Sequence, residues 1–308
     1  MASPATTMKD LLNSLCDKSR TAITAATYFT GIKIVKRGVL PPRTQYPVLT
    51  FLPRSETIVQ YRAGGRYVVD RLCEAHIYVR DLRSNKQGID SVQQYLDDIQ
   101  QLFRANTTLT DSGGAATTTN VEFQSFDFGV SEIEGGYIQH GVVPMIWRSH
   151  EDLPTRILTS TITDNPDTGD IYTAIYNQLY GKRAGTLAAV GTFTKGEFGP
   201  KQRATRPFLI VSADNALHSQ GIYAGADSIN GEYAVTVLSQ VLGGSNNEMD
   251  DHLDIVEPIK DALQEIPHWG GKCLNSAITG IDYSTWAGNN LLHYQTTVRL
   301  STIGKDNN

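Results

Sequence analysis

The chain has 308 residues, of which 40% are hydrophobic and 19% charged, the composition of a globular protein with room for one large domain or two ordinary ones. Its formal net charge of -5 argues against specific nucleic-acid binding and against an anionic membrane surface. No apolar run approaches the ~18 residues of a membrane-spanning helix, so the sequence predicts no membrane partner.

The first half of the chain predicts a helix, three strands, a second helix and two closing strands. The first helix starts near residue 8, where Thr6 or Thr7 can cap it. A strand at 31–35 leads into Gly38–Pro47, a segment rich in proline that also carries Arg43, and then into an apolar strand at 48–52. The next strand, around 73–77, alternates apolar and polar residues, which indicates one buried face.

The second half repeats this order. At an offset of 160 residues (203 − 43), Arg203 takes the place of Arg43 and Pro207 that of Pro47. The alternating residues at 73–77 fall on 233–237, and the helix stripe at 96–103 falls on a similar stripe at 256–263. Near the end of each half the offset becomes 155 (283 − 128), because the first half contains a longer polar loop at 107–120.

We interpret these matches as a tandem duplication. The sequence predicts a first domain at 1–150, a linker at 151–168 and a second, similar domain at 169–308. Each domain is expected to be α+β, with a mainly antiparallel or mixed sheet packed by an N-terminal helix and one long central helix.

The sequence contains none of the common phosphate-binding, zinc-protease or serine-hydrolase motifs. The cysteines Cys16, Cys73 and Cys273 lie far apart, which predicts free thiols without a disulfide framework or a zinc site. The seven histidines occur singly, and the alternation around His76 predicts that its side chain points to solvent or an interface. We therefore predict no catalytic residues, no enzyme activity, no cofactor and no metal.

Charged residues at the predicted strand starts and loops are the candidate interface residues. The acidic run 248–251 has two interpretations, a contact loop or a helix N-terminus that favours acidic residues through the helix dipole. The candidates are Arg43, Arg203, Asp111, Glu248, Asp250 and Asp251.

One phrase resembles a known family. The sequence Pro-Pro-Arg-x-x-x-Pro-Val-Leu-Thr-Phe at 41–51, which follows a helix and a strand, is similar to that of the tail terminator or neck (tail-completion) proteins of tailed bacteriophages. Residues 8–150 carry the resemblance best, whereas residues 168–305 keep Arg203 and Pro207 but lack the Pro-Pro pair.

The resemblance implies a structural virion protein that assembles in the host cytoplasm. Such proteins form a ring at the head–tail junction, terminate the tail tube and join it to the neck or connector. The implied partners are other copies of the chain, the tail tube protein, the head–tail connector and, in sheathed tails, the sheath. Family members usually carry one such domain per chain, so a two-domain chain leaves open a hexamer and a pseudo-hexameric trimer.

Two alternatives remain from the sequence. The first is a baseplate or tube-associated adaptor, which differs from a terminator in its place on the tail. The second is a ligand-binding module or enzyme that uses the acidic loop and aromatic residues, although such aromatic residues are more typical of cores and interfaces. The aromatic residues concerned are Tyr61, Tyr67, Tyr137, Trp147, Trp269 and Trp286.

Overall fold

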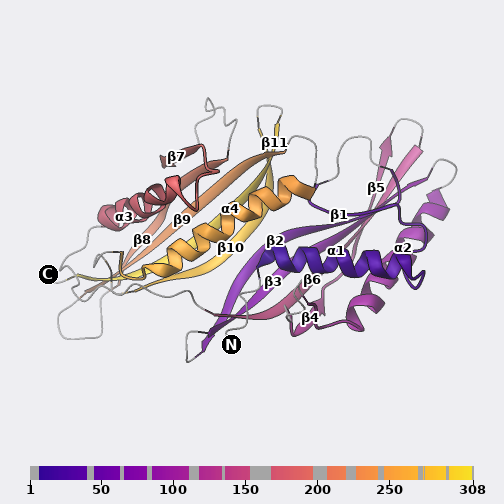
Figure 1. Cartoon of the computed structure of the whole chain (residues 1–308), viewed down its shortest axis with the longest axis horizontal. Helices are drawn as coiled ribbons and strands as arrows, with labels where there is room; N and C mark the ends of the chain where they lie inside the picture. The colour runs from indigo at the N-terminus through magenta and orange to yellow at the C-terminus, as the bar shows by residue number, and fades with distance from the viewer. Residues whose placement is uncertain are drawn as a thin grey trace. The chain divides into compact units, whose positions relative to one another are not determined.

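The structure is a computed structural model of the whole chain (Figure 1). It describes residues 7–39, 45–62, 66–81, 85–110, 118–133, 136–152, 168–196, 207–219, 227–241, 246–269, 273, 275–288 and 291–306. The chain divides into two compact units: unit 1 comprises Met1–Asp152 and Gly243–Asp250, and unit 2 comprises Leu153–Leu242 and Asp251–Asn308. Each unit contains helices and a mixed sheet, so the predicted α+β class is confirmed.

The described elements of unit 1 follow the predicted order, with the strand before the last one divided in two. They are α1 (Met8–Thr24), β1 (Ile34–Arg37), β2 (Val48–Arg62), β3 (Arg66–Asp81), α2 (Asn85–Arg104), β4 (Asn120–Phe123), β5 (Asp127–Ile133) and β6 (Gly136–Asp152). Strand β3 pairs antiparallel with β2 and with β6, while β4 and β5 pair antiparallel with β6. Strand β1 adds a parallel pairing with β2.

A capping box fixes the start of α1. The Thr7 hydroxyl accepts a hydrogen bond from the Asp10 amide, and the Asp10 carboxylate accepts one from the Thr7 amide. These bonds satisfy amide groups that have no partner inside the helix. The prediction that Thr7 can cap this helix is confirmed.

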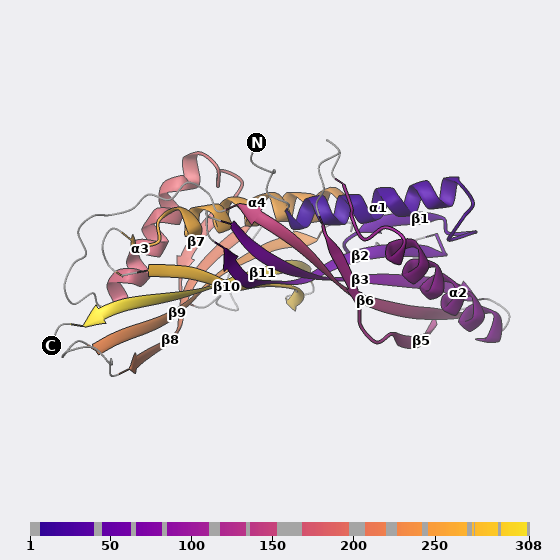
Figure 2. The same cartoon turned by 90° about the horizontal axis from the view of Figure 1, so that it is seen from below.

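Helices α1 and α2 cover one face of the unit 1 sheet (Figures 1 and 2). Cys73, Ala75 and Ile77, the alternate residues of β3, are fully buried, as the period-2 pattern predicts. The Cys73 thiol lies 3.5 Å from the Met8 sulfur of α1. In the same core, Phe103 of α2 packs edge-on against Trp147 of β6 at 5.6 Å between ring centroids.

The described elements of unit 2 come in a similar order, but a short 3-10 turn follows the first helix and two strands, not three, follow the second helix. They are α3 (Thr168–Gly181), η1 (Lys182–Ala184), β7 (Thr192–Lys195), β8 (Phe208–Ser219), β9 (Asp227–Val241), α4 (Asn246–Glu265), β10 (Asn275–Gly288) and β11 (Leu291–Asp306). Strand β7 pairs parallel with β8, and the sheet continues through antiparallel pairings of β8 with β9, β9 with β11 and β11 with β10. The first turn of α4, up to Asp250, belongs to unit 1.

Backbone pairing in the two units follows one register. In unit 1 the β2–β3 ladder begins with Val48 opposite Tyr78, and adding 160 to both numbers gives the first pair of the β8–β9 ladder. The irregularity between Pro53 and Ser55 recurs in β8 at that offset. The pairs of the β3–β6 ladder become those of the β9–β11 ladder when 160 is added to each β3 number and 155 to each β6 number. The two sequence offsets are therefore also offsets of the hydrogen-bond ladders.

The three cysteines are free thiols, each buried. Burial raises the pKa of Cys16 and of Cys273 to about 12, and it raises that of Cys73 as well. A thiol with a raised pKa is a poor nucleophile at neutral pH. Among the described helices, none combines the length and apolar character that a membrane crossing requires.

The close approach of α2 to β6 generates a prediction for Gly141. A Cβ added at Gly141 would lie 2.6 Å from Val92 Cγ1 and 3.1 Å from Leu96 Cδ1, and a valine side chain has little rotamer freedom to move away. We expect Gly141→Ala to lower the free energy of unfolding by about 1–3 kcal/mol, measured by urea denaturation.

Gly129 on β5 is the matched control for this substitution. A Cβ there meets no atom within 4 Å, so Gly129→Ala is expected to change stability by less than about 0.5 kcal/mol. Equal stability of the two variants would contradict the proposed contact between α2 and β6.

Candidate functional site

The structure places three of the six predicted interface residues. Arg43, Arg203 and Asp111 lie outside the described residues. Glu248, Asp250 and Asp251 lie in the first two turns of α4, which begins at Asn246, so the acidic run is a helix N-terminus and not a loop. Carboxylates are stabilised there by the unpaired amides and the dipole of the helix.

The acidic turn contacts the basic end of β1. Arg37 Nη2 donates a hydrogen bond to Asp250 Oδ2 at 2.8 Å, and the two side chains are only 11% and 19% exposed. Burial lowers the pKa of the neighbouring Lys36 to about 8, and the charge of Glu248 opposes this shift. Asp250 is therefore bound within unit 1, whereas Asp251 is exposed.

The segments that contain Arg43 and Arg203 are anchored alike. In unit 1 the Lys33 amide bonds the Pro47 carbonyl and the Gly38 amide bonds that of Phe51. In unit 2 the amides of Gly191 and Gly196 bond the carbonyls of Pro207 and Val211 in the same way. Gly38 and Gly196 have φ angles of 80° and 87°, a region that residues with a Cβ rarely adopt.

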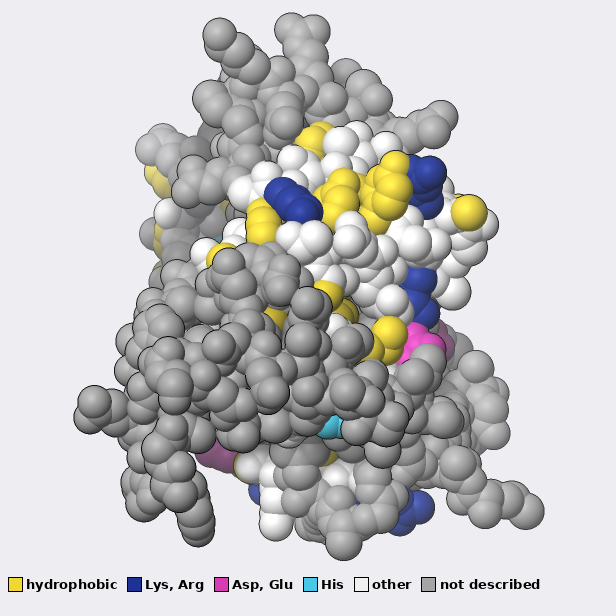
Figure 3. All heavy atoms as spheres, turned by 90° about the vertical axis from the view of Figure 1, so that its left-hand side faces the viewer, with side chains coloured by type: hydrophobic (Ala, Val, Ile, Leu, Met, Phe, Trp, Pro, Cys, Tyr) yellow, Lys and Arg dark blue, Asp and Glu magenta, His cyan; other side chains and the backbone are white. Residues whose placement is uncertain are grey.

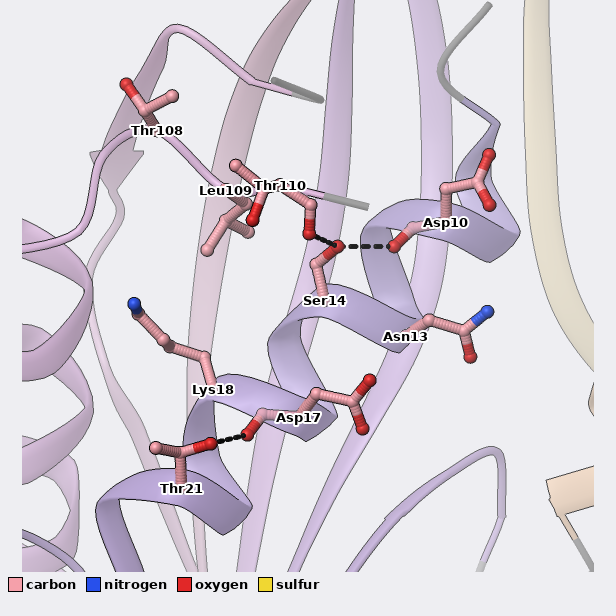
Figure 4. Close-up of a pocket in the computed structure, with 9 residues that line it drawn as sticks. All are labelled: Asp10, Asn13, Ser14, Asp17, Lys18, Thr21, Thr108, Leu109 and Thr110. Atoms are coloured by element: carbon pink, nitrogen blue, oxygen red, sulfur yellow. Dashed lines mark hydrogen bonds between the residues drawn. The ribbon is translucent and has the colours of Figure 1, made fainter. Parts of the chain in front are cut away.

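A polar cavity of about 400 Å³ lies between α1 and the segment Thr108–Thr110, which ends next to Asp111 (Figure 4). Ser14 Oγ lies 2.9 Å from the carbonyl oxygens of both Asp10 and Thr110 and so ties the segment to the helix. Figure 4 shows Asp17 and Lys18 pointing to opposite sides of α1. The charged groups do not converge on one point, which favours a helix–loop contact over a reaction centre.

The largest described cluster of titratable groups lies on the other face of the unit 1 sheet. His76 Nε2 lies 2.8 Å from Glu74 Oε2, and His76 Nδ1 lies 2.9 Å from His140 Nε2. Arg54 forms an ion pair with Glu74 at 2.6 Å, and Tyr78 stacks on His140 with ring centroids 4.3 Å apart. These contacts join β2, β3 and β6 across the face that α1 and α2 do not cover.

Glu74, His140 and Tyr78 of this cluster have settled charges at neutral pH. Burial alone would raise the pKa of Glu74, but hydrogen bonds from His76 and Arg54 outweigh it and lower the value to about 2. Burial, together with the neighbouring His76, lowers the pKa of His140 to about 4. Burial raises the pKa of Tyr78 to about 12. A carboxylate, a neutral imidazole and a neutral phenol are therefore each within hydrogen-bond distance of His76 here.

The prediction for His76 is partly wrong. The side chain lies on the strand face opposite Cys73, but it is 6% exposed and does not point to solvent. The alternation of Glu74, His76 and Tyr78 gave a signal for one polar face. The partners His140 and Arg54 come from other strands, so only the register reveals them.

A second buried polar cluster in unit 1 centres on Arg71 of β3. Its guanidinium contacts Glu56 at 3.2 Å and also bonds Glu151 and Ser149, and Tyr67 donates to Glu151. The side chains of Arg71, Glu56 and Glu151 are at most 2% exposed. Buried charges require such pairing, so this cluster links β2, β3 and β6 structurally.

Unit 2 buries a neutral histidine on α4. His252 is 1% exposed, with Nδ1 at 2.8 Å from Ser239 Oγ and Nε2 at 2.7 Å from Thr296 Oγ1. Burial lowers the pKa of His252 to about 3. Within the described ranges, no group of three or more His, Cys, Asp or Glu side chains is arranged to hold a metal ion.

The aromatic residues named as ligand candidates separate into two groups. Tyr67, Trp147 and Trp269 are at most 2% exposed and belong to the cores, whereas Tyr137 is 39% exposed at the start of β6. The side chains of Tyr61 and Trp286 lie outside the described residues. The described members therefore do not line one groove.

The Arg37–Asp250 pair generates a stability prediction. We expect Asp250→Asn to lower the free energy of unfolding by about 1–3 kcal/mol, because it weakens a charge-assisted bond between two largely buried side chains. Asp251→Asn, one residue further on the exposed side of α4, should change it by no more than about 0.5 kcal/mol. Chemical denaturation of both variants measures these free energies of unfolding. Equal values for the two variants would contradict a stabilising role of the Arg37–Asp250 pair, and Asp250 would then remain a candidate interface residue only.

His252 generates a pH prediction. Its pKa is about 3 in the folded protein and about 6.5 in the unfolded chain, so only the unfolded chain takes up the proton between these values. Its contribution to stability is complete above pH 6.5 and is lost as the pH falls toward 3, by about 2 kcal/mol between pH 7 and pH 5. Urea denaturation across this range should show a shallower acid loss for His252→Val.

The exposed His150 of β6 is the control for this measurement. His150→Gln should keep the acid dependence of the unsubstituted chain. An unchanged acid dependence in His252→Val would rule out His252 as the group responsible.

Comparisons with known proteins assign this chain to no family. A scan against models of protein families found no match, and a search of curated proteins found no sequence with significant similarity. Function is therefore inferred from the residues and the fold of the chain itself.

Proposed function

We propose that this protein is a structural virion protein of a tailed bacteriophage, a tail terminator or neck protein that forms a ring at the head–tail junction. In this role it closes the tail tube and joins it to the connector. Its partners are other copies of itself, the tail tube protein and the neck proteins, and its place is the virion after assembly in the host cytoplasm.

The repeated strand register carries the proposal. Unit 1 and unit 2 share ladder offsets and the position of a β-bulge, and bulges are retained within families of related domains. This agreement supports a tandem duplication of one ancestral domain. A chain with two such domains supplies twelve domains to a hexamer and six to a trimer, and both numbers fit a sixfold tail.

The Pro/Arg segments support the tandem duplication. Each segment follows a short parallel strand, begins at a glycine of positive φ and leads into the longer strand β2 or β8. The bonds to the Pro47 and Pro207 carbonyls hold the end of each segment against the preceding strand. The likeness between the two segments thus extends from their sequence to the hydrogen bonds at their ends.

The described polar clusters also favour a structural role. Glu74, His76 and His140 are bonded to one another, Arg71 is bonded to Glu56 and Glu151, and these groups hold strands together. A reaction centre would instead direct such groups into an accessible pocket.

Assembly tests the proposal. Light scattering of the purified chain should give a mass of three or six copies, and negative-stain microscopy should show rings. Mixed with tubes made from the tube protein of the same genome, the rings should cap one tube end, and tubes alone serve as the control. A strict monomer at high concentration that also fails to bind tubes would refute the proposal.

The position of the protein on the tail separates the proposal from its main alternative. Immunogold labelling at the head–tail junction supports a terminator or neck protein. Labelling at the distal end would instead assign a baseplate or tube-associated adaptor.

A further inference from the structure

Unit 2 carries an aromatic and basic surface over α3, η1 and β7. Tyr176 and Tyr180 stack on α3 with ring centroids 5.7 Å apart, and Phe193 of β7 meets Tyr180 edge-on at 5.6 Å. Arg183 lies over the Tyr180 ring at 3.9 Å, and Lys195 lies 4.9 Å from the Tyr176 centroid. Figure 3 faces the side of the molecule that carries α3, where hydrophobic and basic side chains lie next to each other.

This surface has the composition of a protein–protein contact. Tyrosine and arginine are the residues that most often dominate the binding energy of interfaces. The ring stacking and the cations above the rings hold these side chains in place before a partner arrives, so less conformational entropy is lost on binding. Tyr180 is 37% exposed, and Arg183 and Lys195 are exposed too, so the surface is accessible in the single chain.

Unit 1 carries an apolar surface of opposite charge at β5. Phe128 and Val130 are 53% and 52% exposed, and Tyr137 of the adjoining β6 is 39% exposed. Asp127 at the start of β5 is exposed. The β5 sequence, Asp127–Ile133, contains two acidic residues and no lysine or arginine. This edge is therefore apolar and acidic.

Each surface occurs once in the described chain. The position that matches Phe128 in unit 2 is Tyr283, which is 5% exposed, and the position that matches Asp127 is Asp282, which is paired with Arg299. On α1 of unit 1, Asp17 and Thr21 occupy the exposed side, which carries no tyrosine. One copy thus presents one acidic edge and one basic aromatic surface.

We propose that the β5 edge of one copy docks on the α3–β7 surface of a second copy. The inference rests on the proposed ring-forming function and names the contact that builds the ring. Charge complementarity selects a second copy as the occupant, because Asp127 then faces Lys195 or Arg183 while Phe128 and Val130 cover the exposed Tyr180.

The contact is heterologous, since it joins two different surfaces. Such a contact repeats from copy to copy and closes into a ring at the right rotation. In the described part of the chain, β5 pairs only with β6 and β7 only with β8, so both docking surfaces adjoin a free sheet edge. The backbone groups of two such edges can pair with each other.

A charge exchange tests the contact. Asp127→Lys and Lys195→Asp should each raise the dissociation constant for assembly at least tenfold, so that light scattering shows monomers where the unsubstituted chain forms rings. An equimolar mixture should regain assembly, because each junction then joins opposite charges. The two variants must alternate in that mixture, so closed rings contain an even number of copies, which a hexamer permits and a trimer does not.

Controls separate this contact from damage to the fold. Asp17→Lys, a charge reversal on an exposed side chain of α1 outside both surfaces, should leave assembly unchanged. Tyr180→Ser should prevent assembly and, unlike the charge variants, should not be rescued in the mixture. Circular dichroism confirms folding of each variant.

The outcomes also separate this inference from the proposed function. Rings that persist in both charge variants, or variants that stay monomeric when mixed, would overturn the β5 contact while tube capping by the unsubstituted chain still upheld the function. An unsubstituted chain that is monomeric at every concentration and leaves tubes uncapped would overturn both.

Discussion

The packing of a long helix against the central strands of a small sheet is the constraint on which each unit depends. In unit 1, Val92 of α2 lies so close to β6 that only glycine fits opposite it, at position 141. The matching positions in unit 2 hold His252 of α4 and Thr296 of β11, joined by a 2.7 Å hydrogen bond. One site is filled by apolar contact and the other by a hydrogen-bonded polar pair.

This constraint leaves the remaining surfaces free to diverge. The sheet face without helices carries Glu74, His76 and Tyr78 in unit 1, whereas the matching positions in unit 2 are Ala234, Thr236 and Leu238. The same divergence extends to β5, where the exposed Phe128 of unit 1 corresponds to the buried Tyr283 of unit 2. Two units with equivalent cores and different surfaces are suited to a protein whose role is to contact several partners.

Much of the fold was predictable because alternation and helical stripes depend on local geometry. The residues at which the helices begin could not be predicted in the same way. Asp90 and Ser91 are residue types that commonly cap helices, but α2 already begins at Asn85, and Pro258, which cannot donate a backbone hydrogen bond, lies inside α4. Residue preferences at helix starts are weak, and the structural context often overrides them. Of the predicted linker at 151–168, the described residues are the end of β6, which runs to Asp152, and the start of α3 at Thr168; residues 153–167 lie outside the described part of the chain.

The sequence alone determined the element order, the buried faces and the offsets of 160 and 155, because each depends on the spacing of residue types along the chain. Tertiary structure decided which charged groups meet. Asp250 pairs with Arg37 across 213 residues of chain, and His76 reaches His140 only because β3 and β6 align in one register. Spacing fixes which face a side chain occupies, but the partner on that face is chosen by strand register and helix packing, which bring distant segments together.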